Sequence, residues 1–141
     1  MSEPAQPAHM TNRAVEDAAV TYVLGWELAH GRPSQDTRGT GAAADVAGEH
    51  RTIEVKAYGG SARGQDLWLE PRQFDEAVQN PNFWLYVVDN IRQGNPAQFR
   101  LLEIGGERLH LMLSRAVERR YFTVPWPVAV YDDLVRNQHS G

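Results

Sequence analysis

The spacing of apolar residues in the first part of the chain predicts one helix followed by three strands. A capping residue, Thr11 or Asn12, precedes an apolar stripe with a period of three to four residues, so we expect a helix to about Leu24. After Gly25 the pattern alternates between apolar and polar residues, which is typical of a strand. A Gly- and Pro-containing loop separates the first strand from the other two, which a tight turn joins. The predicted strands are Trp26–His30, Ala42–Ala47 and Arg51–Tyr58.

The second part of the chain predicts one further helix and two strands. Pro71 is typical of a first helical position, and the helix should bury Phe74, Ala77 and Val78 before Asn80 and Pro81 end it. Residues 83–88 are continuously apolar, as in a central strand, and residues 99–104 predict another strand. Farther on, apolar positions between 109 and 121 fit a helix, and residues 128–134 fit a closing strand or strap.

These elements predict an α/β fold in which helices flank a mixed β-sheet. The predicted order is αβββαββ plus a C-terminal helix or strap. We expect a single domain over residues 12–135, with a Pro- and Ala-rich disordered tail at residues 1–11 and a second tail at 136–141.

Composition narrows the class of protein. A hydrophobic fraction of 42% indicates a folded globule, and the absence of cysteine excludes disulfides and thiolate metal sites. With neither a long apolar run nor a signal segment, we expect a cytoplasmic protein without a membrane partner. The net charge of −4 does not suggest nonspecific affinity for nucleic acid, unless bound cations neutralise some of the acids.

The chain contains one lysine, Lys56, against thirteen arginines. Because side chains alternate along a strand, Glu54 and Lys56 should share one face. A four-residue loop over residues 48–51 would put Asp45 directly opposite Glu54, and a two-residue loop would put the two acids diagonally on one face. A three-residue loop would separate them unless a bulge intervenes.

Two neighbouring carboxylates beside an ammonium group are suited to binding a hard cation. Mg²⁺ is normally held by one or two carboxylates, with waters and phosphate oxygens completing its shell. Lys56 could then orient or deprotonate a water, or stabilise charge on phosphorus. The simpler interpretation is an ion pair on a solvated strand face, worth at most about 1 kcal/mol.

These residues resemble the PD-(D/E)xK nuclease superfamily, whose fold is restriction-endonuclease-like, and most closely the NO VEIN C-terminal type of domain. The similarity is carried by Arg51–Ala57, Leu69–Val78 and Phe83–Val88, and it spans roughly residues 12–104. The superfamily's proline is absent, since Ala44 precedes Asp45. The resemblance implies a Mg²⁺- or Mn²⁺-dependent endonuclease, a hydrolase of phosphodiester bonds in restriction, defence or repair.

The resemblance also implies roles for individual residues. Asp45 and Glu54 would bind the metal with the Val55 carbonyl, and Lys56 would be catalytic. Glu16 on the first helix, or secondarily Asp17, would add a metal ligand. Gln73 on the second helix would be a further site residue.

Two other functions stay open at this stage. The fold could serve as a noncatalytic module that binds a partner protein or nucleic acid, which the acidic charge balance favours. Alternatively, the chain could supply the cutting centre to a separate specificity subunit. The expected substrate is DNA rather than RNA, and a homodimer would allow both strands to be cut.

Overall fold

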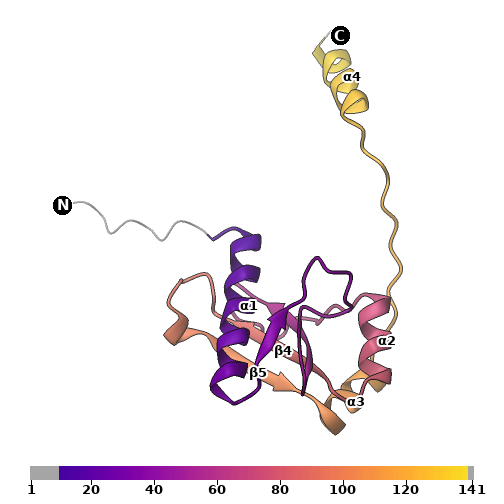
Figure 1. Cartoon of the computed structure of the whole chain (residues 1–141). Helices are drawn as coiled ribbons and strands as arrows, with labels where there is room; N and C mark the ends of the chain where they lie inside the picture. The colour runs from indigo at the N-terminus through magenta and orange to yellow at the C-terminus, as the bar shows by residue number, and fades with distance from the viewer. Residues whose placement is uncertain (1–9, 140–141) are drawn as a thin grey trace, which may run out of the picture.

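The structure is a computed structural model, which describes residues 10–139. Residues 1–9 and 140–141, which belong to the two predicted tails, lie outside the described residues. The core is a five-stranded mixed sheet with helices on both faces (Figure 1). The predicted α/β class is therefore confirmed. The strands are β1 (Ser34–Asp36), β2 (Val46–Gly48), β3 (Thr52–Ala57), β4 (Phe83–Asp89) and β5 (Arg100–Ile104).

The strands lie in the sheet in the order in which they occur in the chain. β1, β2 and β3 pair antiparallel, β3 and β4 pair parallel, and β5 returns antiparallel to β4. The parallel pair needs a crossover, and helix α2 (Pro71–Gln79) provides it. β3 and β4 are therefore the central strands, and β4 is buried along almost its whole length.

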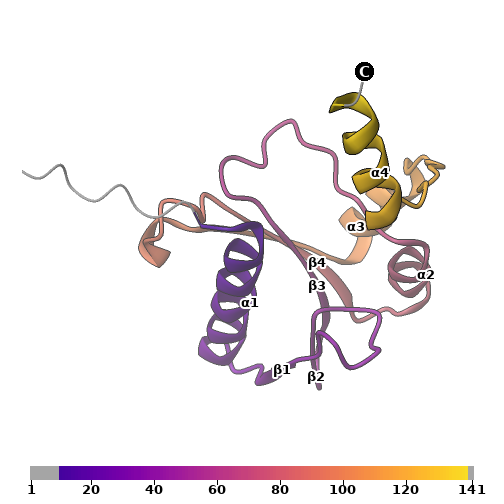
Figure 2. The same ribbon diagram turned by 90° about the horizontal axis from the view of Figure 1, so that it is seen from above.

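Each face of the sheet has its own hydrophobic cluster. Helix α1 (Asn12–Ala29) covers one face, where Ile53 and Tyr86 contribute to the first cluster. Helices α2 and α3 (Gly106–Ser114) cover the other face, where Phe83, Leu85 and Leu109 form the second cluster. Viewed from above, the sheet lies between α1 and the α2–α3 pair (Figure 2).

The structure corrects the sequence prediction in the first third of the chain. Residues 26–29 continue α1 instead of forming a strand, because Trp26 stacks on Tyr22 one turn earlier and the buried Glu27 extends the helical stripe. These contacts outweigh the roughly 0.5–1 kcal/mol that Gly25 costs within a helix. The first of the three predicted strands is instead β1, within the predicted loop. Its three largely polar residues carry no strand pattern.

The second half requires three further corrections. Val78 is 53% exposed, so α2 buries Ala77 fully and Phe74 in part, but not Val78. The helix that was predicted to reach residue 121 is α3, and it ends at Ser114. Residues 115–121 are not helical. Residues 128–134 were predicted to form a closing strand or strap, and the strand is wrong, because this segment begins helix α4 (Val128–His139). An extended segment carries α4 away from the sheet (Figure 1). Within residues 10–139, no helix is long and apolar enough to cross a membrane.

Candidate functional site

Asp45, Glu54 and Lys56 come together where β2 pairs with β3. The paired residues Val46–Ile53 and Ala47–Thr52 are those of the four-residue loop over residues 48–51. That register is one of the two that were expected to bring Asp45 and Glu54 together. Glu54 and Lys56 lie on the α2 side of the sheet, since their parallel partners are Leu85 and Val87.

Glu54 is the most unusual side chain of this group. It is a carboxylate with only 3% of its surface exposed, and its Oε1 atom is buried without a hydrogen-bond partner. Its other oxygen, Oε2, lies 3.1 Å from Lys56 Nζ. Burial and repulsion by Asp45 raise the pKa of Glu54 to about 7, against the opposing effect of Lys56. The one positive charge of Lys56 therefore does not fully offset the burial of Glu54 and the negative charge of Asp45.

Asp45 is held by the strand beside it. Its Oδ2 atom accepts a hydrogen bond of 3.1 Å from the Val55 backbone N–H, and its own N–H donates to the Ile53 carbonyl at 3.1 Å. The first bond fixes the carboxylate against β3 without using Oδ1. The Val55 side chain is buried on the opposite, α1 face of the sheet.

The donor set fits a hard divalent cation. The unpartnered Glu54 oxygen and the half-buried Asp45 carboxylate supply the oxygen ligands that Mg²⁺ or Mn²⁺ prefers. A cation there would also remove the repulsion between the two acids. Two carboxylates are enough for Mg²⁺, which usually keeps several waters.

Glu16, the predicted metal ligand on the first helix, does not join this group. Glu16 is exposed on α1 and lines a shallow hollow with Arg13, Asp17 and Arg38. Asp17, the second choice, forms an ion pair of 2.7 Å with Arg38. The described residues contain no cluster of three acidic or histidine side chains able to hold a metal, so Glu16 does not complete one with Asp45 and Glu54.

Gln73, the predicted site residue on the second helix, makes a structural contact. Its Oε1 atom accepts a hydrogen bond of 3.0 Å from the Glu70 N–H, as part of a capping box at the start of α2. A cleft of about 360 Å³ lies between α2 and the segment that precedes β2. Thr52 contributes to its wall, but Glu54 and Lys56 do not.

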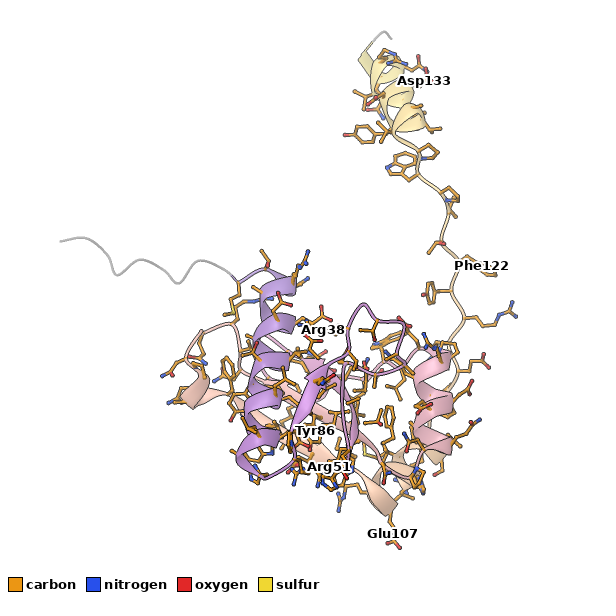
Figure 3. All side chains as sticks on the ribbon, in the orientation of Figure 1. Arg38, Arg51, Tyr86, Glu107, Phe122 and Asp133 are labelled. Atoms are coloured by element: carbon orange, nitrogen blue, oxygen red, sulfur yellow. The ribbon has the colours of Figure 1, made fainter. Side chains whose placement is uncertain are left out.

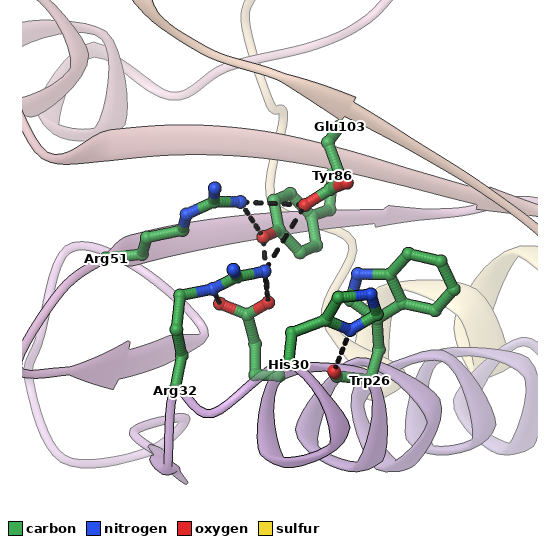
Figure 4. A network of polar contacts seen from close by, with 7 residues as sticks. Trp26, His30, Arg32, Arg51, Tyr86 and Glu103 are labelled. Atoms are coloured by element: carbon green, nitrogen blue, oxygen red, sulfur yellow. Dashed lines mark hydrogen bonds and ion pairs between the residues drawn. The ribbon is translucent and has the colours of Figure 1, made fainter.

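A polar network that the sequence pattern did not predict lies on the opposite face of the sheet (Figure 4). Glu27 is 1% exposed; Arg32 binds it through two nitrogens at 2.9 and 2.7 Å, and the Tyr86 hydroxyl donates to it at 3.0 Å. Arg51 donates to the Tyr86 hydroxyl at 2.5 Å and to Glu103 at 2.7 Å. Burial alone would raise the pKa of Glu27, but the hydrogen bonds from Arg32 and Tyr86 hold it below its ordinary value.

This network ties α1 to the sheet and leaves its charges paired. Arg51 also stacks on the Trp84 ring at 3.7 Å from the ring centre. Both arginines are bound to carboxylates, which leaves little positive charge for an anion, and removing one partner of the buried pair would be destabilising. An acid in the apolar stripe of α1 could have indicated a buried ion pair. Because residues 26–30 were predicted to be a strand, Glu27 was not recognised as part of that stripe.

Asp89 is a second buried acid that was not among the predicted site residues. It ends β4, and its Oδ2 atom accepts a hydrogen bond of 2.9 Å from the Ala62 N–H in the loop after β3. Its Oδ1 atom lies 3.2 Å from Arg100 Nε. In the sequence, Asp89 is a single acid at the end of an otherwise apolar run. That position could have indicated that its carboxylate is buried and holds neighbouring segments.

Comparison with known proteins places the chain in a family context. A family model described as "Protein NO VEIN, C-terminal" matches residues 15–102 of the 141. The matched segment begins within α1 and ends within β5, so it contains Asp45, Glu54 and Lys56. Neither a curated protein nor a solved structure gave a significant match.

Proposed function

The chain belongs to the NO VEIN C-terminal family, and we propose that its Asp45–Glu54–Lys56 site is the centre of a metal-dependent nuclease. The substrate would be DNA, cut at internal phosphodiester bonds in restriction, defence or repair. Support comes from the five-stranded mixed sheet flanked by helices, which is compatible with a restriction-endonuclease-like core. The observation that carries the proposal is the buried Glu54 oxygen without a partner, next to a second carboxylate.

Asp45 and Glu54 would hold Mg²⁺ or Mn²⁺, with the Val55 carbonyl as a further ligand. A bound ion of this kind lowers the pKa of its water and polarises the phosphate. The protein's own contribution would come from Lys56. The Lys56 side chain is 20% exposed beside Glu54, and its ammonium group can donate a hydrogen bond to the attacking water or to the phosphate oxygen that gains charge.

Cleavage of supercoiled plasmid and of single-stranded DNA in Mn²⁺, with EDTA as the blank, tests the proposal. We expect activity in the wild type that is lost in Glu54→Gln, Asp45→Asn and Lys56→Ala. Glu49→Gln is a matched control, because this exposed acid lies in the turn between the same two strands. Wild-type activity in Glu54→Gln or Lys56→Ala would show that the cutting centre lies elsewhere.

A second function is favoured by one observation. The residues that the structure describes bring together only two metal-binding side chains at this site, and Glu16 stays apart. A noncatalytic module that binds a partner protein or nucleic acid would need no bound metal. Mn²⁺ titration followed by calorimetry distinguishes the two functions: submillimolar binding that Asp45→Asn removes supports the nuclease, and no binding even with DNA present supports the module.

A further inference from the structure

The loop that follows β3 begins on the face of the sheet that carries Lys56. Tyr58 continues the parallel ladder, because its N–H donates to the Val88 carbonyl at 2.9 Å, so its register partner is Asp89. Both side chains lie two residues beyond the Lys56–Val87 pair and on the same side of the sheet, since side chains alternate along a strand. Two residues along a strand span roughly 7 Å. Tyr58 and Asp89 are therefore close neighbours of the candidate site.

These two side chains hold the loop in place. We call residues 59–66 the anchored loop. Its Ala62 N–H donates a hydrogen bond of 2.9 Å to the Asp89 carboxylate, which is buried. Its Asp66 carbonyl accepts a hydrogen bond of 3.2 Å from the Tyr58 hydroxyl. The loop is therefore fixed beside the candidate site, on the same face of the sheet.

Arg63 stands at the tip of a turn within the anchored loop. A backbone hydrogen bond of 3.0 Å closes this turn around Arg63 and Gly64, whose φ of 79° suits the turn. The Arg63 side chain is exposed and has no hydrogen bond or ion pair within residues 10–139. By contrast, Arg38 and Arg51 lie against the body of the protein, each paired with a carboxylate (Figure 3). The guanidinium group of Arg63 is therefore available to a ligand.

The chain segment that carries the site is poor in positive charge. Between Thr52 and Pro71 it contains two cations, Lys56 and Arg63. Lys56 is paired with Glu54 at 3.1 Å, so Arg63 is the unpaired cation of this segment. A guanidinium group binds phosphate oxygens through two parallel hydrogen bonds. Arg63 is thus suited to a phosphate that lies next to the site.

The backbone of the anchored loop is open at Gly60. A Cβ atom added there would meet no atom within 4 Å, and the backbone of Gly60 is outside the left-handed region. Neither packing nor backbone conformation therefore requires a glycine at this position. Glycine also serves where a ligand approaches the backbone closely. That use fits an open position on a loop beside the site.

We propose that the anchored loop binds a phosphate of the DNA backbone next to the bond that is cut, with Arg63 as the contacting side chain. The inference rests on the proposed function, because it takes the DNA to lie against the same site. Arg63 would contribute to substrate binding and not to the breaking of the bond.

The salt dependence of DNA binding tests this contact. Fluorescence anisotropy of a labelled duplex measures binding by the full chain over a range of NaCl concentrations, with Ca²⁺ in place of Mg²⁺. Arg63→Gln should weaken binding about tenfold and lower the slope of log K against log [NaCl] by about 0.9, the share of one phosphate contact. Arg63→Lys should keep the slope, since it keeps the charge. Arg13→Gln is the matched control, because Arg13 is also exposed but belongs to α1, which covers the opposite face of the sheet.

Gly60→Val tests the close approach to the backbone separately. Thermal melting should show a normally folded protein, because the added side chain begins in open space. DNA binding should nevertheless fall about tenfold, with an unchanged salt slope, since the variant removes no charge.

The outcomes separate this inference from the proposed function. DNA binding that depends on Arg63, in a chain that cleaves no DNA, supports the contact and counts against the nuclease. Cleavage by the wild type, with unchanged binding and slope in Arg63→Gln, refutes the contact and leaves the nuclease. A wild type that binds no DNA at low salt, or an equal loss in Arg13→Gln, would also overturn the contact.

Discussion

Replacing Glu54 with glutamine should stabilise the metal-free protein above neutral pH. In the folded state, burial and the Asp45 carboxylate raise the pKa of Glu54 from about 4.5 to about 7. Between these two pH values the folded chain binds a proton that the unfolded chain has released. Stability is therefore lost as the pH rises from about 4.5 through about 7. The full loss is about 3 kcal/mol, and it already includes the attraction of Lys56.

Glu54→Gln removes this cost because the amide does not ionise. In EDTA at pH 8, the variant should melt on the order of 5–10 °C above the wild type, and the difference should vanish near pH 5. Circular dichroism melts across pH 5–8.5 measure the effect. Glu49→Gln should show no such difference, since its carboxylate is exposed. Millimolar Mn²⁺ should raise the melting temperature of the wild type but not that of Glu54→Gln.

One result would refute this reasoning. If Glu54→Gln lowers the melting temperature by the same amount at pH 5 and at pH 8, Glu54 is an ordinary structural acid. Burying the ionised Glu54 carboxylate beside Asp45 would then cost no free energy that a bound cation could remove.

Two further predictions concern the scaffold. Glu27→Gln should cost about 2–3 kcal/mol in urea unfolding at pH 7, because it weakens a buried, charge-assisted pair; Asp36→Asn, in an exposed pair, should cost at most about 1 kcal/mol. Gly105→Ala should cost about 1–3 kcal/mol in the same assay, because its Cβ would come within 2.5 Å of the Trp84 ring, and unchanged stability would contradict this packing; Gly60→Ala, with nothing within 4 Å, should be neutral.

The sequence located the central strands and the acid–lysine site because both depend on short-range patterns. β3, β4 and α2 match their predicted bounds closely, since alternation, an apolar run and Pro71 each mark one element. The meeting of Asp45 with Glu54 followed from one of a few hairpin registers. Such features need no knowledge of distant contacts.

What the sequence could not supply depends on tertiary contacts. Residues 26–29 are helical because the buried Glu27 meets Arg32 and Tyr86, and Tyr86 is 59 residues away. β1 exists because β2 pairs with it, and its own three residues show no pattern. The segment at 128–134 was predicted to be a closing strand or strap from its apolar residues, but it forms a helix that leaves them exposed.

The hydrogen bond from the Val55 amide to the Asp45 carboxylate makes that amide a natural spectroscopic probe. Its proton senses the charge on Asp45 directly, so a diamagnetic ion such as Mg²⁺ that draws electron density from the carboxylate should shift its nuclear magnetic resonance signal. Opening of the β2–β3 hairpin would expose the same proton to exchange with solvent. A single backbone resonance could thus report both ligand occupancy and the integrity of the strand pair, without any added label.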